Sequence, residues 1–144
     1  MSASLRHVGI VVKNLDKCKA FWVDLMGYEI ERECLESGEV LDAIVDLENV
    51  KVTTVKLRGR DGSMIELLKF HSHLSGESWQ GNAHQTGLTH VAMNVDDLSV
   101  LYEQRAQNGL RFKNPPQLSP DGKVRVSYCN GPEGLLLELV ESLS

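Results

Sequence analysis

The chain has 144 residues, 42% hydrophobic and 24% charged, which is typical of one globular domain or of two small fused modules. Its formal net charge is −5, and no basic run predicts a nucleic-acid or membrane surface. No apolar stretch approaches the roughly 20 residues needed to span a bilayer, and the N-terminus lacks the apolar region of a signal peptide. Three widely spaced cysteines without a CxxC motif favour reduced thiols, so we expect a cytoplasmic protein.

The first half of the chain predicts the order strand, helix and several strands. Residues 8–12 are apolar and β-branched, as in a buried strand. Apolar residues at helical spacing predict an amphipathic helix over 15–26, capped by Asn14 or Asp16 and ended by Gly27. Further strands are expected over residues 28–31, 40–47, 51–57 and 64–70.

The second half repeats this order after a polar segment, 71–86, that predicts a linker. A strand is expected over 88–95, followed by a helix that Asp96 or Asp97 caps and that runs to Gln107. Two more strands are predicted over 124–129 and 135–141, and the segments around Pro115 and Pro120 predict turns.

Four residues occupy matching positions in the two halves of the chain. His7 begins an apolar strand in the first half, and His90 does so in the second. Glu66 and Glu138 lie in the last predicted strand of each half. The segment between His and Glu is 11 residues longer in the first half, and we expect this excess in the middle strands and in the loop 58–62.

Strand alternation predicts that the four residues share one kind of surface. Successive side chains of a strand point to opposite faces, so each His and Glu opposes a row of apolar neighbours. If each half curls into a half-barrel, the four faces line a shared concave cup. Desolvating a lone carboxylate in this cup costs several kcal/mol. Two His and two Glu that share a bound cation avoid this cost, because the cation compensates their charge.

Each residue taken alone has a simpler interpretation. A single His in a strand is more often a core residue with a backbone hydrogen bond, and a Glu near a strand end more often faces solvent. Four such residues in matching positions of a repeat favour a shared divalent transition metal with one or two open positions. Affinity order alone does not choose among Zn, Ni, Co, Mn and Fe.

Three motifs resemble the vicinal oxygen chelate superfamily, which includes glyoxalase I, methylmalonyl-CoA epimerase, extradiol dioxygenases and fosfomycin-resistance enzymes. The motifs are HVGIVV at 7–12, GLTHVAMNVDDL at 87–98 and GPEGLLLELVE at 131–141. The resemblance covers essentially residues 5–141. It implies an α+β fold of two tandem βαβββ modules that form a cupped mixed sheet. The modules would span about 5–70 and 87–141 of a single domain, 1–144.

By the same resemblance, His7, Glu66, His90 and Glu138 match the four metal-ligand positions of the family. Ring-cleaving dioxygenases of the superfamily use two His and one Glu, which correspond here to His7, His90 and Glu138. They need three open positions for O₂ and a bidentate catechol, and a ligand at Glu66 would occupy one of them. The full set is therefore more similar to glyoxalase I and the epimerase.

The resemblance implies a lyase or isomerase that moves a proton next to a carbonyl through a metal-stabilised, enediolate-like intermediate. Glu138 would be a metal ligand and the base, and Glu66 a ligand and a second acid or base on the opposite side of the substrate. The alternatives are an extradiol-type dioxygenase and a non-catalytic protein that binds a small molecule for resistance.

The partners that follow are a small-molecule substrate, a glutathione or CoA thioester or adduct among them, and a second copy of the chain. Such a substrate needs cationic anchors, for which the sequence offers Arg58, Arg60, Lys69, Lys123 and Arg125. We expect a homodimer because a partner tends to complete cups made of exposed sheet edges. The modules can pair within one chain or between chains.

Overall fold

A computed structural model describes residues 1–74, 76–79 and 82–143. The chain divides into two compact units, Met1–Gly76 (unit 1) and Glu77–Ser144 (unit 2). The division falls within the polar segment 71–86, of which positions 75, 80 and 81 lie outside the described residues. Among the helices of the described residues, none is long and apolar enough to cross a membrane.

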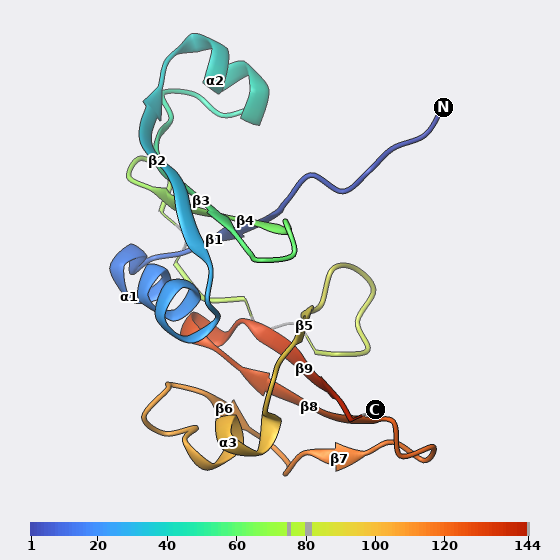
Figure 1. Ribbon diagram of the computed structural model, residues 1–144. Coiled ribbons are helices and arrows are strands. Elements are labelled where there is room, and N and C mark those ends of the chain that lie inside the picture. Colours follow the sequence, from blue (N-terminus) through green and yellow to red (C-terminus); the bar gives the residue numbers. More distant parts are fainter. Residues whose placement is uncertain (75, 80–81, 144) are drawn as a thin grey trace. The chain divides into compact units, whose positions relative to one another are not determined.

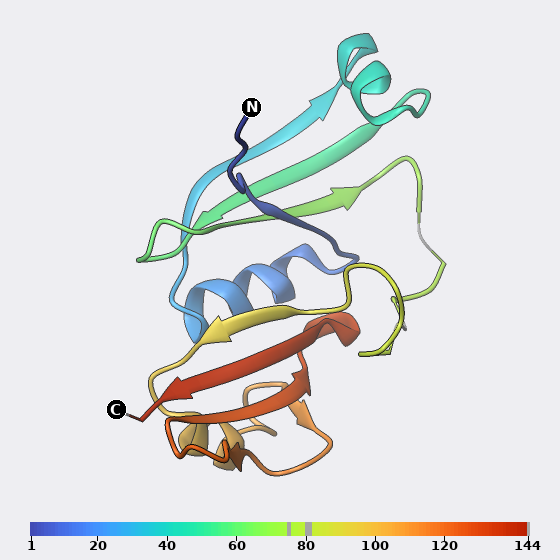
Figure 2. The same cartoon turned by 90° about the vertical axis from the view of Figure 1, so that its right-hand side faces the viewer.

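Unit 1 has a four-stranded mixed sheet with one helix packed on it (Figures 1 and 2). The strand order is β1-β4-β3-β2, in which β1 pairs with β4 in parallel and the other pairs are antiparallel. The elements are β1 (Val8–Val11), α1 (Leu15–Ala20), a π-helical turn (Phe21–Leu25), β2 (Glu29–Ser37), α2 (Glu39–Val45), β3 (Lys51–Arg58) and β4 (Met64–Phe70).

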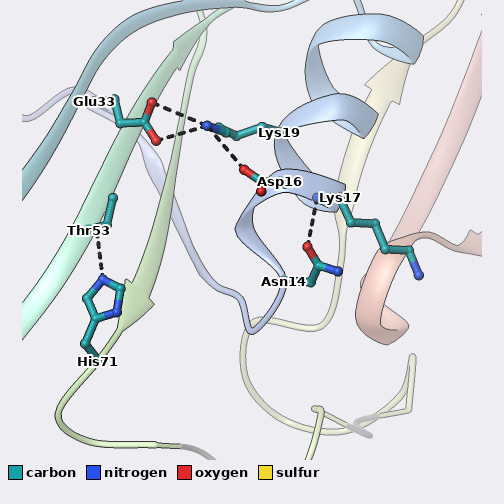
Figure 3. Close-up of polar contacts among 7 residues, drawn as sticks. All are labelled: Asn14, Asp16, Lys17, Lys19, Glu33, Thr53 and His71. Carbon is teal, nitrogen blue, oxygen red and sulfur yellow. Dashed lines mark hydrogen bonds and ion pairs between the residues drawn. The ribbon is translucent and has the colours of Figure 1, made fainter.

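Helix α1 begins at Leu15 as predicted, but it ends at Ala20, and residues 21–25 continue the predicted helix as a π-helical turn. The Asn14 side chain accepts a hydrogen bond from the Lys17 backbone N–H at 3.0 Å (Figure 3), which satisfies one of the free donors of the first turn. Gly27 follows the π-helical turn with a φ of +75°, a conformation that few other residues adopt. Trp22, only 1% exposed, packs edge-on against Phe21 and Tyr28 and anchors the core of this unit.

The strand predicted over Val40–Leu47 is wrong, because this segment contains helix α2 at the outer end of the β2–β3 hairpin (Figure 1). Its apolar residues recur with a spacing of four, which suits a helix better than a strand. The Asp42 carboxylate accepts from the backbone N–H groups of Asn49 and Val50, each at 2.9 Å, and closes the turn that follows. Val40 and Ile44 remain 76% and 74% exposed.

Helix α2 accounts for most of the extra length of the first half, part of which was predicted to lie elsewhere. The connections between the last two strands, 59–63 and 131–135, have equal length, so the predicted excess in the loop 58–62 is wrong. The extra residues lie between β2 and β3, where they form α2.

Unit 2 contains a five-stranded sheet of related topology. The path is β5-β9-β8-β6, with β7 also paired to β8, and β5 is parallel to β9. The elements are β5 (Val91–Asn94), α3 (Leu98–Glu103), β6 (Arg111–Phe112), β7 (Gln117–Leu118), β8 (Val124–Asn130), a 3₁₀ turn (Pro132–Gly134) and β9 (Leu136–Ser142). The predicted α+β class and the paired βαβββ order are confirmed by these two mixed sheets.

Two short strands, β6 and β7, stand where unit 1 has the single strand β2. Both pair with β8, β6 at Cys129 and Asn130 and β7 at Arg125 and Val126. The predicted turn around Pro115 separates them, because a proline has no N–H to donate to a ladder.

Helix α3 begins as predicted and ends earlier. Asp97 accepts a hydrogen bond from the Val100 N–H at 3.0 Å, and the Glu141 carboxylate accepts from the Leu98 N–H at 2.9 Å. The helix ends at Glu103 rather than Gln107, where the Arg105 guanidinium donates to the Tyr102 carbonyl at 2.7 Å. The same carbonyl also accepts from the Arg105 backbone N–H at 3.3 Å.

Candidate metal centre

The parallel pairing of β1 with β4 brings His7 to Glu66. Gly9 is the register partner of Glu66, and His7 lies two residues earlier, so its side chain emerges on the same face. His7 Nε2 is 3.7 Å from Glu66 Oε1, and both side chains are partly buried. The sequence prediction placed His7 inside the strand, but β1 begins one residue later, at Val8.

Unit 2 repeats this arrangement in its own parallel pair. Ala92 is the register partner of Glu138, and His90 again lies two residues earlier, just before β5. His90 Nε2 is 3.2 Å from Glu138 Oε2. The predicted strand from Leu88 is therefore too long at its start, since β5 begins at Val91.

The two histidines differ in what surrounds the ring. His90 Nδ1 is 2.8 Å from the Thr89 hydroxyl, a hydrogen bond that fixes the ring orientation and turns Nε2 toward Glu138. The Tyr128 ring lies beside it, with centroids 5.0 Å apart and planes at 44°. Neither of these two residue types stands at the matching place in unit 1: Arg6 precedes His7, and Lys56 takes the position of Tyr128.

Each pair has donor atoms that suit adjacent positions on a transition metal. Metal–nitrogen and metal–oxygen bonds of about 2.0–2.2 Å at tetrahedral or octahedral angles separate neighbouring donors by roughly 3.0–3.4 Å. The observed separations of 3.2 and 3.7 Å lie at and slightly above this range. Within residues 1–74, 76–79 and 82–143, no three His, Cys, Asp or Glu side chains gather to hold a metal, so each unit offers two donors.

The cross-strand neighbours of the two carboxylates are different. Lys56 on β3 is the direct partner of Glu66, and Arg32 on β2 is the direct partner of Lys56. Tyr128 on β8 is the direct partner of Glu138. Strand alternation predicts that Lys56 and Leu57 lie on opposite faces of the sheet. The sequence does not predict that Lys56 pairs with Glu66, because that pairing depends on the register between β3 and β4.

Two of the five cationic residues offered as substrate anchors bind carboxylates of the protein instead. Arg58 binds the Glu31 carboxylate through Nε and Nη2, at 2.9–3.2 Å, and Arg125 binds Glu141 at 3.2 Å. Lys69 pairs with Thr53 on the face of the sheet opposite Glu66. Arg60 and Lys123 are exposed in turns.

The histidine that follows β4 also turns away from the His7–Glu66 pair. His71 Nε2 is 2.8 Å from the Thr53 hydroxyl (Figure 3). Thr53 lies next to Thr54 on β3 and shares its face with Val55, opposite the face of Lys56 and Glu66. On that same side, Lys19 of α1 reaches Glu33 of β2 at 3.0 Å (Figure 3).

The three cysteines form no disulfide among the described residues, and their surroundings differ. Cys18 and Cys129 are buried, whereas Cys34 on β2 is partly exposed on the face of Lys56. Burial raises the pKa of the Cys129 thiol to about 12. Cys129 is therefore a core residue, and Cys34 is the thiol that reagents can reach.

Comparison with known proteins agrees with this architecture. The family model described as the Glyoxalase/Bleomycin resistance protein/Dioxygenase superfamily matches residues 6–128. The uncharacterised protein YaeR of Escherichia coli is 25% identical over 141 residues, which cover 95% of each chain.

Two solved structures have the same fold. A glyoxalase family protein from Bacillus cereus superposes with a TM-score of 0.88 at 23% identity, covering 100% of this chain and 97% of its own. The fosfomycin resistance protein FosX of Listeria monocytogenes, solved with Mn(II) and sulfate, has a TM-score of 0.60 at 18% identity and covers 99% and 95%. The matched family model, the tandem sheets and the resemblance of the three motifs agree: the chain belongs to the glyoxalase/bleomycin resistance protein/dioxygenase superfamily.

Proposed function

We propose that this protein is a metal-dependent lyase or isomerase that moves a proton next to a carbonyl, of the glyoxalase I or methylmalonyl-CoA epimerase type. One observation carries the proposal: each unit holds a His–Glu contact at the same parallel register, with His two residues before the strand partner of Glu. A repeat of this kind supplies two nitrogen and two oxygen donors, a set suited to a divalent transition ion.

The proposed ligands are His7, Glu66, His90 and Glu138, drawn from both units of one chain or from two chains of a dimer. When bound, the ion would polarise the carbonyl oxygen of the substrate and acidify the neighbouring C–H bond. A family relative, FosX, was solved with Mn(II), which makes manganese one of the ions to test alongside Zn, Ni, Co and Fe.

The carboxylates are assigned the proton transfers. Glu138 would accept the proton from the carbon next to the carbonyl, and Glu66 would deliver or accept a proton on the other side of the substrate. The hydrogen bond between the Thr89 hydroxyl and His90 Nδ1 supports this assignment, because it holds the His90 ring at a fixed orientation beside Glu138.

The decisive experiment combines metal analysis with an assay panel. The purified protein is analysed for bound metals, stripped with a chelator and reloaded with Ni, Co, Mn, Zn or Fe. Each form is assayed with the methylglyoxal–glutathione adduct, methylmalonyl-CoA, catechols and fosfomycin. We expect about one ion per pair of His–Glu contacts and activity in one of the first two assays.

Histidine variants make the metal analysis specific. His7→Ala and His90→Ala should each lower the metal content, whereas His84→Ala, an exposed histidine of the segment 71–86, should leave it unchanged. A protein that takes up no stoichiometric metal and gains no activity from any of the five ions would overturn the proposal.

Two other outcomes would assign a different function. Iron-dependent O₂ uptake with a catechol that survives Glu66→Ala would identify a ring-cleaving dioxygenase. Tight small-molecule binding that a chelator leaves unchanged would identify a non-catalytic binding protein.

The proposed assembly is a homodimer, and a glutathione or CoA conjugate is the proposed substrate class to test first. Light scattering at micromolar protein concentration should give twice the chain mass of 16.0 kDa. A monomer under these conditions would contradict the dimer and leave both His–Glu contacts to one chain.

A further inference from the structure

A row of polar residues crosses the sheet of unit 1 on one face. The register places Glu66 of β4 opposite Lys56 of β3, and Lys56 opposite Arg32 of β2. Residues directly opposite on antiparallel strands have Cβ atoms about 4.5–5.5 Å apart and point to the same side of the sheet. The row therefore runs from the His7–Glu66 contact at the β1 edge to Arg32 at the β2 edge.

The central member of this row has no partner for its charge. Within the part of the chain that the structure describes, Lys56 Nζ makes no hydrogen bond and lies within 4.0 Å of no carboxylate. Glu66, its cross-strand neighbour, instead directs Oε1 toward His7. Among the described residues, Arg32 reaches only the Cys34 sulfur, at 3.8 Å, a weak contact for a guanidinium.

The pairing of Lys56 with Arg32 is unfavourable in the free protein. Like charges directly opposite one another destabilise a sheet, and among the described residues no carboxylate lies within 4.0 Å of either charged group. Arg58, two residues along the same strand, has the ordinary arrangement, because its guanidinium is held by Glu31 and the Gly62 carbonyl. The unfavourable pair thus lies only where β3 passes the His7–Glu66 contact.

We propose that Lys56 and Arg32 bind an oxyanion, a carboxylate or a phosphate-like group carried by the substrate. The ammonium offers three donors and the guanidinium a planar fork, which together suit a group with several acceptor oxygens. This inference rests on the proposed function for its substrate, and it narrows the substrate to a carbonyl compound with a negatively charged group. The charged group is held on the unit 1 side, next to His7 and Glu66.

The experiment measures anion binding to the metal-free protein at constant ionic strength. Isotope-labelled protein is titrated with inorganic phosphate and, separately, with malonate, and binding is followed by NMR shifts of backbone amides. We expect saturable shifts centred on residues 32–34 and 54–58. A response to phosphate alone assigns a phosphate-like group, and a response to malonate alone assigns a carboxylate.

Three variants localise the site. Lys56→Met and Arg32→Met should each weaken the binding of the responding anion by about tenfold or more, as expected for a lost charge-assisted hydrogen bond. Lys69→Met is the matched control, because Lys69 is a partly buried lysine on the opposite face of the same sheet, and its effect should stay below about twofold. Lys56→Arg should retain binding and shows that the fold tolerates change at this position.

The proposal is overturned if neither anion gives a saturable response, or if Lys69→Met weakens binding as much as Lys56→Met. Because metal is absent from this titration, its result is independent of the metal analysis. Anion binding without any metal uptake would overturn the proposed function alone, and metal uptake without anion binding would overturn only the oxyanion site.

Discussion

The His7–Glu66 contact of unit 1 and the His90–Glu138 contact of unit 2 have the same backbone register but different cross-strand neighbours. In unit 1, the carboxylate lies beside Lys56, whereas in unit 2 it lies beside Tyr128, whose ring also contacts His90. The repeated strands fix where the donor atoms lie. The residue on the next strand then decides whether each pair has a cationic or an aromatic surrounding.

This difference suggests a division of work between the two units. The unit 1 face presents Lys56 and Arg32, neither of which forms an ion pair within the described residues, and such cations suit the recognition of a negatively charged group. The unit 2 face holds its histidine by a hydrogen bond to Thr89 and by the Tyr128 ring, which suits a reaction that needs a fixed geometry.

Replacing the two carboxylates by glutamine compares the units directly. Glu138→Gln should lower kcat by about 10²–10⁴-fold, the usual contribution of a general base, and Glu66→Gln should lower it less. The measurement is kcat with the substrate found active in the panel, together with the metal content of each variant. A greater loss for Glu66→Gln at equal metal content would exchange the two roles.

Matched core substitutions compare the stability of the two sheets. Leu67 and Leu139 follow the two carboxylates on β4 and β9, and both are fully buried. Each leucine-to-alanine change should lower the free energy of unfolding by about 2–5 kcal/mol, because it removes buried methyl groups and leaves a cavity. Denaturant unfolding measures the change, and a loss well under 1 kcal/mol at either site would contradict the described core.

The helix caps provide a smaller contrast. Asn14→Ala and Asp97→Ala should each lower the free energy of unfolding by about 0.5–2 kcal/mol. We expect the smaller loss for Asp97→Ala, since the Glu141 carboxylate still accepts from Leu98 at the start of α3. If Glu141→Gln removes this difference in denaturant unfolding, the Glu141 carboxylate is responsible for the smaller loss. A larger loss for Asp97→Ala than for Asn14→Ala would contradict this role of Glu141.

The last comparison concerns the thiols and high pH, and it predicts no change in stability at neutral pH. The buried Cys129 has a pKa raised from 9.0 to about 12, so its contribution to stability is complete below pH 9 and is lost as pH rises toward 12. Between pH 9 and 12, the free energy of unfolding should therefore fall less in Cys129→Ala than in Cys34→Ser. In the folded protein at neutral pH, a thiol reagent should label Cys34 well before Cys18 or Cys129.

Several features of the fold were predictable because they depend on neighbours along the chain. Apolar alternation and turn residues predicted β4 at its observed bounds and the start of α1, and Asn14 was among the expected caps. The strand prediction for segment 40–47 was wrong because the composition of its apolar residues suits a strand, whereas their spacing suits a helix. The turn that closes α2 depends on Asp42 reaching residues seven and eight positions away.

The sequence by itself determined the repeat and the membership of each His–Glu pair, because motif spacing is a property of the linear chain. The superfamily followed from the resemblance of three motifs to known members. Only the tertiary structure decided which residues lie across from each carboxylate, since register depends on the pairing of distant segments. It turned Arg58 and Arg125 from anchors into partners of Glu31 and Glu141. It also brought Lys56 beside Glu66. The linear sequence does not show this neighbour, on which the proposed oxyanion site depends.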